Sequence, residues 1–318
     1  MRIFLLFQVL FLFAISTFAQ ISVGTKNVEH PSKFNLNDWA KYKTLKTYFV
    51  IRESDKKNES LIRSILQDVW KFNSYEIIDF DQYKLMPEDG GAIFFGLRNY
   101  NTKFMSYPTS DLAGRDVESN NIKIELWRNL PKGKYHLISE DVLAYMIITS
   151  TPDFGLELRN RKTADAFEYI CKSDVEVQEW GWGFIKNILQ EMNRRIIANE
   201  PRWEFQKEID KDKIHELKSE ILYVPSNIDL FFEQYREKPK FETYAGKEII
   251  FLSPKELSDK ILKSGTKFYY LQFHSPNSGK KVVSIINSVT GEYLYTDFTK
   301  TSPYFSEKDI SILNSVIK

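Results

Sequence analysis

Apolar residues in the first third of the chain occur in two patterns, short continuous runs and a stretch with helical spacing. Residues 45–51, 75–80 and 92–97 are short, mainly apolar runs of the kind that form buried strands. Between the first two runs, apolar residues recur three and four positions apart and predict one buried helical face: Leu61, Ile62, Ile65, Leu66, Val69 and Trp70. A strand, a helix and a second strand predict a crossover connection and a partly parallel sheet.

The patterns after this first block are weaker. Residues 122–127 predict one more strand, whereas the apolar run at 142–148 fits a strand or a helix. Asp81 is expected to begin a brief helix that Pro87 ends. The polar segment 99–121 predicts a long surface loop.

The middle of the chain has a helical pattern. Six apolar residues at helical spacing, followed by Pro201, predict a helix that ends before this proline: Phe184, Ile185, Ile188, Leu189, Met192 and Ile196. The charged segment 209–217 predicts a further helix. We expect residues 161–216 to connect two folded units.

The last third of the chain carries the clearest start and turn signals. The Ser-Pro-Lys-Glu stretch at Ser253 combines a capping box with a proline at the first helical position. Ser306 is expected to cap a C-terminal helix. Residues 281–287 and 292–296 predict a hairpin around a Thr-Gly pair. This hairpin resembles those of small exported PepSY-type modules, but the resemblance covers the hairpin alone and transfers no site.

Short blocks of sequence recur 172 positions apart. The stretch at Leu45 is echoed at Leu217, and residues 75–78 are echoed at 247–250. The shared offset and order favour a duplicated block. We predict an α/β fold, with α+β as the alternative, in which two tandem units with mixed β-sheets are joined by a helical segment: residues 20–160, the connector 161–216 and residues 217–318.

The N-terminus has the pattern of a secretory signal, residues 1–19. Arg2 precedes an almost wholly apolar run at 3–15, and the small residues Thr17 and Ala19 occupy the positions that a signal peptidase reads. The run is shorter than the roughly 20 residues of a spanning helix. We therefore expect cleavage before Gln20 and export to the periplasm or the medium, with no membrane span in the mature protein.

Composition argues against some partners and bonds. The chain has 44 Lys+Arg against 43 Asp+Glu and no dense basic cluster, which argues against nucleic acid as a partner. Cys171 is the only cysteine, so no internal disulfide can form. It lies in an apolar, helix-like stretch and is expected to be buried and inert rather than nucleophilic.

Few residues form a chemical pattern. The four histidines lie far apart, and no pair of metal ligands or nucleophile motif is present, so neither a metal nor a cofactor is predicted. His274 is the best placed of them because it ends a strand before a turn, although an exposed turn residue is the simpler interpretation. Asp79 and Asp81 could act together in acid–base chemistry. The repeat aligns Asp81 with Ser253, which favours a capping role instead.

Trp180-Gly181-Trp182 is the most unusual local feature. Two tryptophans beside glycine could form a stacking platform for a sugar or a peptide. Because Trp182 directly precedes the apolar helical face, a packing cluster at the helix entry is the competing interpretation. The candidate ligand-binding residues are therefore Trp180, Trp182 and His274.

Export, neutral charge and the lack of a catalytic motif together favour a non-catalytic protein of the cell envelope that binds a protein or a glycan. A glycan- or peptide-binding module centred on the two tryptophans is the alternative. An unrecognised hydrolase is less favoured, with acidic residues as its only candidates.

Overall fold

The structure is a computed structural model of the chain. It describes residues 21–24, 32–105, 116–129, 140–148, 163–174, 180–203, 205–231, 243–245, 247–277, 280–299 and 304–318, with the single positions 154, 157, 158, 161, 177 and 302. The predicted signal, residues 1–19, lies outside these residues. Within them, no helix combines the length and the apolar character needed to cross a membrane.

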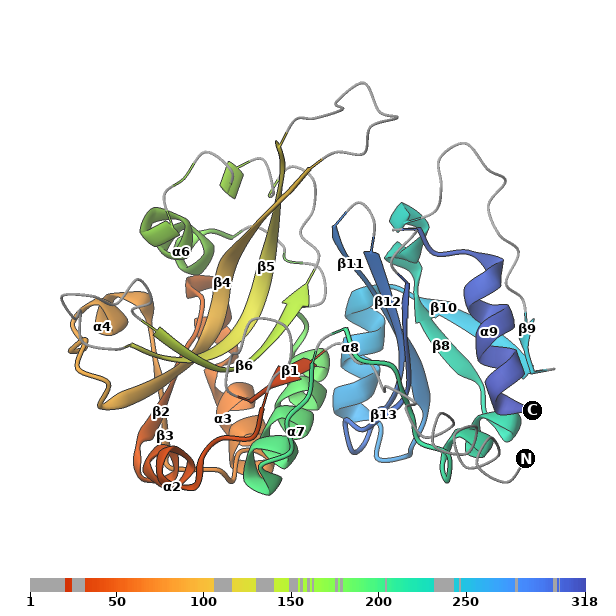
Figure 1. Cartoon of the computed structure of the whole chain (residues 1–318), viewed down its shortest axis with the longest axis horizontal. Coiled ribbons are helices and arrows are strands. Elements are labelled where there is room, and N and C mark those ends of the chain that lie inside the picture. The colour runs from red at the N-terminus through yellow and green to blue at the C-terminus, as the bar shows by residue number, and fades with distance from the viewer. Residues whose placement is uncertain are drawn as a thin grey trace, which may run out of the picture.

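The first unit, unit 1, is built on a six-stranded mixed sheet (Figure 1). Its strands are β1 (Ile21–Val23), β2 (Lys46–Val50), β3 (Tyr75–Ile78), β4 (Ala92–Met105), β5 (Asp116–Asn129) and β6 (Glu140–Ile148). They lie in the order β1-β6-β5-β4-β2-β3. β2 is parallel to both of its neighbours, and the other pairs are antiparallel. The predicted crossover is present, because α3 (Glu59–Val69) links the parallel strands β2 and β3.

Unit 2 is built on a seven-stranded mixed sheet. Its strands are β7 (Glu208–Ile209), β8 (Leu222–Pro225), β9 (Thr243–Tyr244), β10 (Lys247–Leu252), β11 (Tyr269–Asn277), β12 (Lys280–Asn287) and β13 (Tyr293–Thr299). Their order is β7-β13-β12-β11-β8-β10-β9. β8 is parallel to β10 and β11, and the other pairs are antiparallel. The predicted hairpin is confirmed as β12–β13.

Apart from β9, the two sheets have the same strand order and the same strand directions. The two parallel pairs lie at the same end of each sheet, followed by the antiparallel strands. The α/β fold with two tandem units is confirmed, and the matching topology is the arrangement that a duplication would produce.

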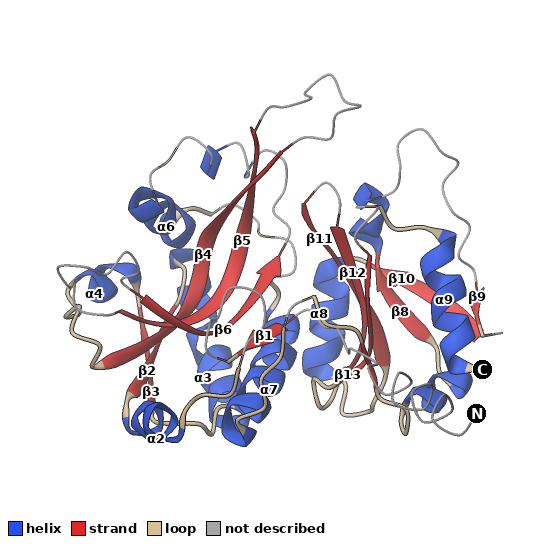
Figure 2. Ribbon diagram, viewed as in Figure 1, coloured by secondary structure: helices blue, strands red, loops and turns tan. Residues whose placement is uncertain are grey.

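Three local predictions are corrected by the structure. Residues 99–105 and 116–121 are not part of a loop, because β4 and β5 pair from Asn99 and Ile122 outward to Met105 and Asp116, whereas residues 106–115 lie outside the described residues. Figure 2 shows this ribbon extending beyond the rest of its sheet, where a strand needs no apolar alternation. Segment 209–217 contains no α-helix, since the 3-10 helix η3 (Ile214–Ser219) follows β7. The echo of Leu45 at Leu217 is therefore not structural. Leu45 directly precedes β2, whereas Leu217 lies in η3.

The helices arrange the molecule in layers (Figures 1 and 2). α4 (Phe80–Lys84) and α6 (Thr163–Lys172) cover the outer face of the unit 1 sheet, with α2 (Leu36–Thr44) near its edge. α3 and α7 (Trp182–Ala198) cover its inner face. α8 (Pro254–Lys263) follows on the near side of the unit 2 sheet, and α9 (Glu307–Ile317) lies on the far side.

One hydrophobic core crosses the junction between the units. It joins the apolar faces of α3 and α7 to Leu257, Ile261 and Tyr270 of unit 2. All six predicted apolar positions of α7 are buried, whereas Leu61 on α3 is an exception at 38% exposed. Because α6 packs on unit 1 alone, α7 is the element of the predicted connector that joins the two units.

The helix starts follow the predicted capping chemistry with one correction. The Glu256 backbone N–H donates to Ser253 Oγ at 3.2 Å, and Ser306 begins α9 with its own capping box. The cap of α4 is Asp79 rather than Asp81, because the Gln82 backbone N–H donates to Asp79 Oδ1 at 2.9 Å. Asp81 instead forms an ion pair with Lys172 at 3.0 Å.

Candidate functional site

A groove of about 550 Å³ lies between the two units. One wall is the 3-10 helix η2 (Glu53–Asn58) with the start of α3, and the other is the first turns of α8. The Trp180–Trp182 segment lies between these walls. We call this site the inter-unit groove, and it is lined by Arg52, Ser54, Asp55, Lys57, Asn58, Leu61, Asp174, Val177, Trp180, Gly181, Trp182, Phe184, Pro254, Lys255, Ser258, Asp259 and Leu262.

The two candidate tryptophans are held in the groove by one carboxylate. Trp180 Nε1 donates to Asp55 Oδ2 at 2.8 Å, and Trp182 Nε1 donates to Asp55 Oδ1 at 3.2 Å. The two rings meet edge to face, with centroids 5.7 Å apart and planes at 63°. Trp180 is 9% exposed and Trp182 is 8% exposed. Both indole N–H groups thus donate to Asp55, so the part of each ring that lines the groove is mainly apolar.

Arg52 fixes the same wall from behind. Its Nε donates to the Ile170 carbonyl at 3.1 Å and its Nη2 to the Ser173 carbonyl at 2.7 Å. These are carbonyls at and just beyond the C-terminal end of α6, where a cation is favoured. Burial lowers the pKa of Arg52, and attraction to Asp55 opposes that shift. The Asp55 carboxylate is therefore held between two indole donors and a buried guanidinium.

Two glycines let α7 approach α8 closely at the bottom of the groove. A Cβ on Gly183 would stand 2.2 Å from the Ser258 carbonyl oxygen, and a Cβ on Gly181 would stand 2.3 Å from Ser258 Oγ. The Gly183 backbone N–H donates to Ser258 Oγ at 3.0 Å. Only glycine fits these positions without moving a helix.

Replacing Gly183 with alanine is expected to destabilise the protein by about 1–3 kcal/mol, because the added methyl meets backbone that cannot give way. Urea unfolding followed by circular dichroism measures this change. Gly265→Ala is the matched control at the end of α8, where an added Cβ meets nothing within 4 Å. Equal stability of Gly183→Ala and the natural chain would contradict the close approach of the two helices.

Charges of both signs surround the groove. The Asp259 carboxylate forms ion pairs with Lys255 Nζ at 3.1 Å and with Lys263 Nζ at 3.4 Å, and all three residues lie on α8. Lys57 is exposed and makes no hydrogen bond or ion pair within the part of the chain that the structure describes. Three helices also begin at the groove, α3 after Asn58, α7 after Gly181 and α8 at Pro254. Their N-terminal ends carry partial positive charge.

The third candidate residue, His274, lies elsewhere. It is on β11 opposite Val282 and is 3% exposed, and its Nδ1 has no hydrogen-bond partner among the residues that the structure describes. Burial lowers the pKa of His274 to about 3, so the ring is neutral. It is not the exposed turn residue that its sequence position suggested, because β11 continues to Asn277.

The acidic candidates Asp79 and Asp81 share no cleft with each other or with His274. Asp79 caps α4 and pairs with Lys56 at 3.0 Å, Asp81 pairs with Lys172, and His274 is buried in the other unit. None of the three lines the inter-unit groove. Cys171 is buried as expected, and burial raises the pKa of its thiol to about 12. Among the residues that the structure describes, no group of three His, Cys, Asp or Glu side chains could hold a metal ion.

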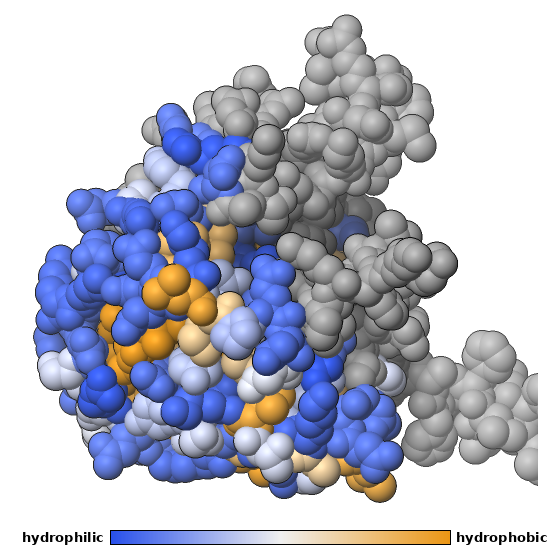
Figure 3. All heavy atoms as spheres, turned by 90° about the vertical axis from the view of Figure 1, so that its left-hand side faces the viewer, coloured by the Kyte–Doolittle hydropathy of each residue, from blue (hydrophilic) through white to orange (hydrophobic). Residues whose placement is uncertain are grey.

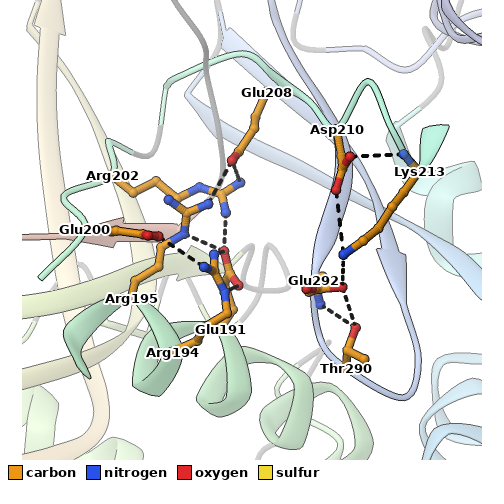
Figure 4. A network of polar contacts seen from close by, with 10 residues as sticks. All are labelled: Glu191, Arg194, Arg195, Glu200, Arg202, Glu208, Asp210, Lys213, Thr290 and Glu292. Atoms are coloured by element: carbon orange, nitrogen blue, oxygen red, sulfur yellow. Dashed lines mark hydrogen bonds and ion pairs between the residues drawn. The ribbon is translucent and has the colours of Figure 1, made fainter. Parts of the chain in front are cut away.

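A buried ionic cluster joins the units at the other end of α7 (Figure 4). It consists of Glu191, Arg194, Arg195, Arg202 and Glu208. Glu191 Oε1 accepts hydrogen bonds from Arg195 Nε and from Arg202 Nη1, both at 2.5 Å. The Glu191 carboxylate also accepts two hydrogen bonds from Arg194, at 2.9 and 3.0 Å. Glu208 on β7 pairs with Arg195 at 2.9 Å and with Arg202 at 2.8 Å.

The cluster is structural by its surroundings. Glu191 and Arg202 are each 1% exposed. The backbone of Arg202 exchanges two hydrogen bonds of 2.8 Å with Val23 of β1, so α7, β1 and β7 meet at one guanidinium. Burial alone would raise the pKa of Glu191, but the arginines outweigh it and lower that pKa to about 2. The sequence pattern singled out none of these residues.

Comparisons with protein-family models, with curated proteins and with solved structures find no match to this chain. The functional argument therefore starts from the inter-unit groove.

Proposed function

We propose that this chain is an exported, non-catalytic protein of the cell envelope that binds a partner in the inter-unit groove. The observation that supports the proposal is the groove itself, a concave site of about 550 Å³ whose walls come from both units. Grooves of this size that combine apolar side chains with polar and charged groups can bind ligands, and this groove is lined by both kinds of residue. Export is inferred from the signal pattern of residues 1–19.

The packing of the molecule supports a preformed site. The core that crosses the junction, the close approach of Gly183 to Ser258 and the ionic cluster of Glu191 all hold unit 1 against unit 2. Packed interiors resist continuous deformation. The two walls of the groove therefore stay at a fixed separation, which lowers the entropic cost of binding.

The outer face of unit 1 is a weaker candidate for the partner. Figure 3 shows this face as mainly hydrophilic, with apolar patches of limited extent. Scattered exposed apolar residues such as Leu85, which is 86% exposed, are normal on a protein surface. Leu61 differs from Leu85 because it lines the groove.

Site-specific photo-crosslinking in intact cells tests the proposal. A photoreactive residue at Leu61 is expected to capture a discrete partner, whereas the same residue at Leu85 captures none. The partner is identified by mass spectrometry and then purified. Leu61→Asp is expected to weaken its binding about tenfold, through loss of an apolar contact and the cost of desolvating a charge, while Leu85→Asp leaves binding unchanged. Capture at both positions alike, or turnover of the captured molecule, would contradict the proposal.

A further inference from the structure

The tryptophans form a corner rather than a flat platform. Their planes meet at 63°, and each ring is less than one tenth exposed. Stacking against a sugar ring needs an accessible aromatic face, and neither indole N–H is available to a hydroxyl because both donate to Asp55. Leu61, which is 38% exposed, is the accessible apolar surface beside the edges of the two rings, and together the three side chains suit one apolar side chain rather than a stacked sugar ring. This geometry favours a peptide over the glycan alternative.

The acids of the groove are already engaged. Asp55 accepts two indole N–H groups, and Asp259 accepts two lysines of its own helix. Asp174 lies within electrostatic reach of the buried Arg52. The acidic groups therefore offer a ligand little negative charge that is not already offset.

An excess of positive charge remains on both walls, because Lys57 has no partner among the described residues and two lysines on α8 share one carboxylate. Lys57 on η2 makes no hydrogen bond or ion pair among the described residues. Lys255 on α8 has a side chain that is 85% exposed, and it shares Asp259 with Lys263, so it can turn to a ligand while Lys263 keeps that carboxylate paired. One cation thus stands on each side of the apolar corner.

We propose that the inter-unit groove binds an acidic peptide segment of the partner. An apolar side chain enters the Trp180–Trp182 corner, and carboxylates on either side of it meet Lys57 and Lys255. This inference rests on the proposed binding function and names the chemistry of the partner. The charge pattern, positive on both walls around an apolar centre, is complementary to an acidic–apolar–acidic sequence.

The test uses the full mature chain with ¹⁵N-labelled tryptophan and follows the indole N–H resonances, assigned with Trp180→Phe and Trp182→Phe. The probe is the blocked tripeptide acetyl-Glu-Leu-Glu-amide. We expect saturable shifts of the Trp180 and Trp182 signals. The neutral peptide acetyl-Gln-Leu-Gln-amide and the truncated peptide acetyl-Glu-Gly-Glu-amide are each expected to bind at least threefold more weakly.

Variants locate the charges. The double variant Lys57→Gln/Lys255→Gln is expected to weaken binding of the acidic peptide about tenfold, since each exposed ion pair contributes modestly. Lys260→Gln is the matched control, because this lysine is on the same helix, contacts the rings of Tyr223 and Phe268, and does not line the groove. Raising the salt concentration should weaken binding to the natural chain and have little effect on the double variant.

Three results would overturn the acidic-peptide assignment: equal affinity for the neutral peptide, equal weakening by Lys260→Gln, or no saturable shift at all. Shifts produced by a trimer of N-acetylglucosamine instead would assign the groove to a glycan. A partner that is captured at Leu61 but is not displaced by the acidic tripeptide would leave the binding function standing and remove only the peptide class. Failure of capture at Leu61 would remove the binding function itself.

Discussion

Replacing Glu191 with glutamine is expected to lower the free energy of unfolding by about 3–5 kcal/mol at pH 7, the usual cost of removing one partner from a buried ion pair. The substitution keeps the shape of the side chain but leaves the guanidinium groups of Arg195 and Arg202 with only Glu208 of the two carboxylates that they share. Both arginines are buried, so water cannot replace the lost charge. Urea unfolding at constant ionic strength measures the loss.

Glu200→Gln is the matched control for this prediction. Glu200 pairs with Arg194 at 3.1 Å, but its side chain is 51% exposed, and such surface pairs contribute at most about 1 kcal/mol. Glu191→Leu combined with Arg202→Leu is expected to recover part of the loss, because apolar pairs often replace buried ion pairs at little cost. A loss below about 1 kcal/mol for Glu191→Gln would contradict the structural role of the cluster.

The sequence predicted the secondary structure best where the signal for a helix lies within that helix. The apolar positions of α3 and α7 predicted their buried faces, and Ser253 and Ser306 predicted the starts of α8 and α9. These signals depend on residues within a few positions of each other. The strand order was predictable only in part, because periodicity does not say which strands pair.

The groove could not be derived in this way. Asp55 lies 125 positions before Trp180, and nothing around Asp55 marks it as the acceptor for an indole N–H. The charged side of α7 illustrates the same limit. Glu191 and Arg195 have the spacing of a solvated helical face, yet they are buried because β1 and β7 from different units close over them. One signal was available, since Gly183 inside a predicted helix indicates close packing.

His274 gives the second large effect, an expected dependence of stability on pH. Burial lowers its pKa in the folded protein from an ordinary 6.5 to about 3. Between pH 3 and pH 6.5, His274 is protonated in the unfolded chain but neutral in the folded protein. The stability that this group contributes is therefore fully present above pH 6.5 and is lost progressively as the pH falls toward 3, by about 1.4 kcal/mol for each pH unit.

The window from pH 8 to pH 5 isolates this effect, because the pKa of Glu191 falls from an ordinary 4.5 to about 2 and its contribution is lost only below that range. Across the window, the natural chain is expected to lose about 2 kcal/mol through His274. His274→Gln, which carries no charge at any pH, is expected to remove that loss, and His215→Gln, at an exposed position, is expected to retain it. Parallel curves for His274→Gln and the natural chain would mean that the His274 ring is reached by water or paired in the folded state. The burial of His274 on β11 would then be wrong.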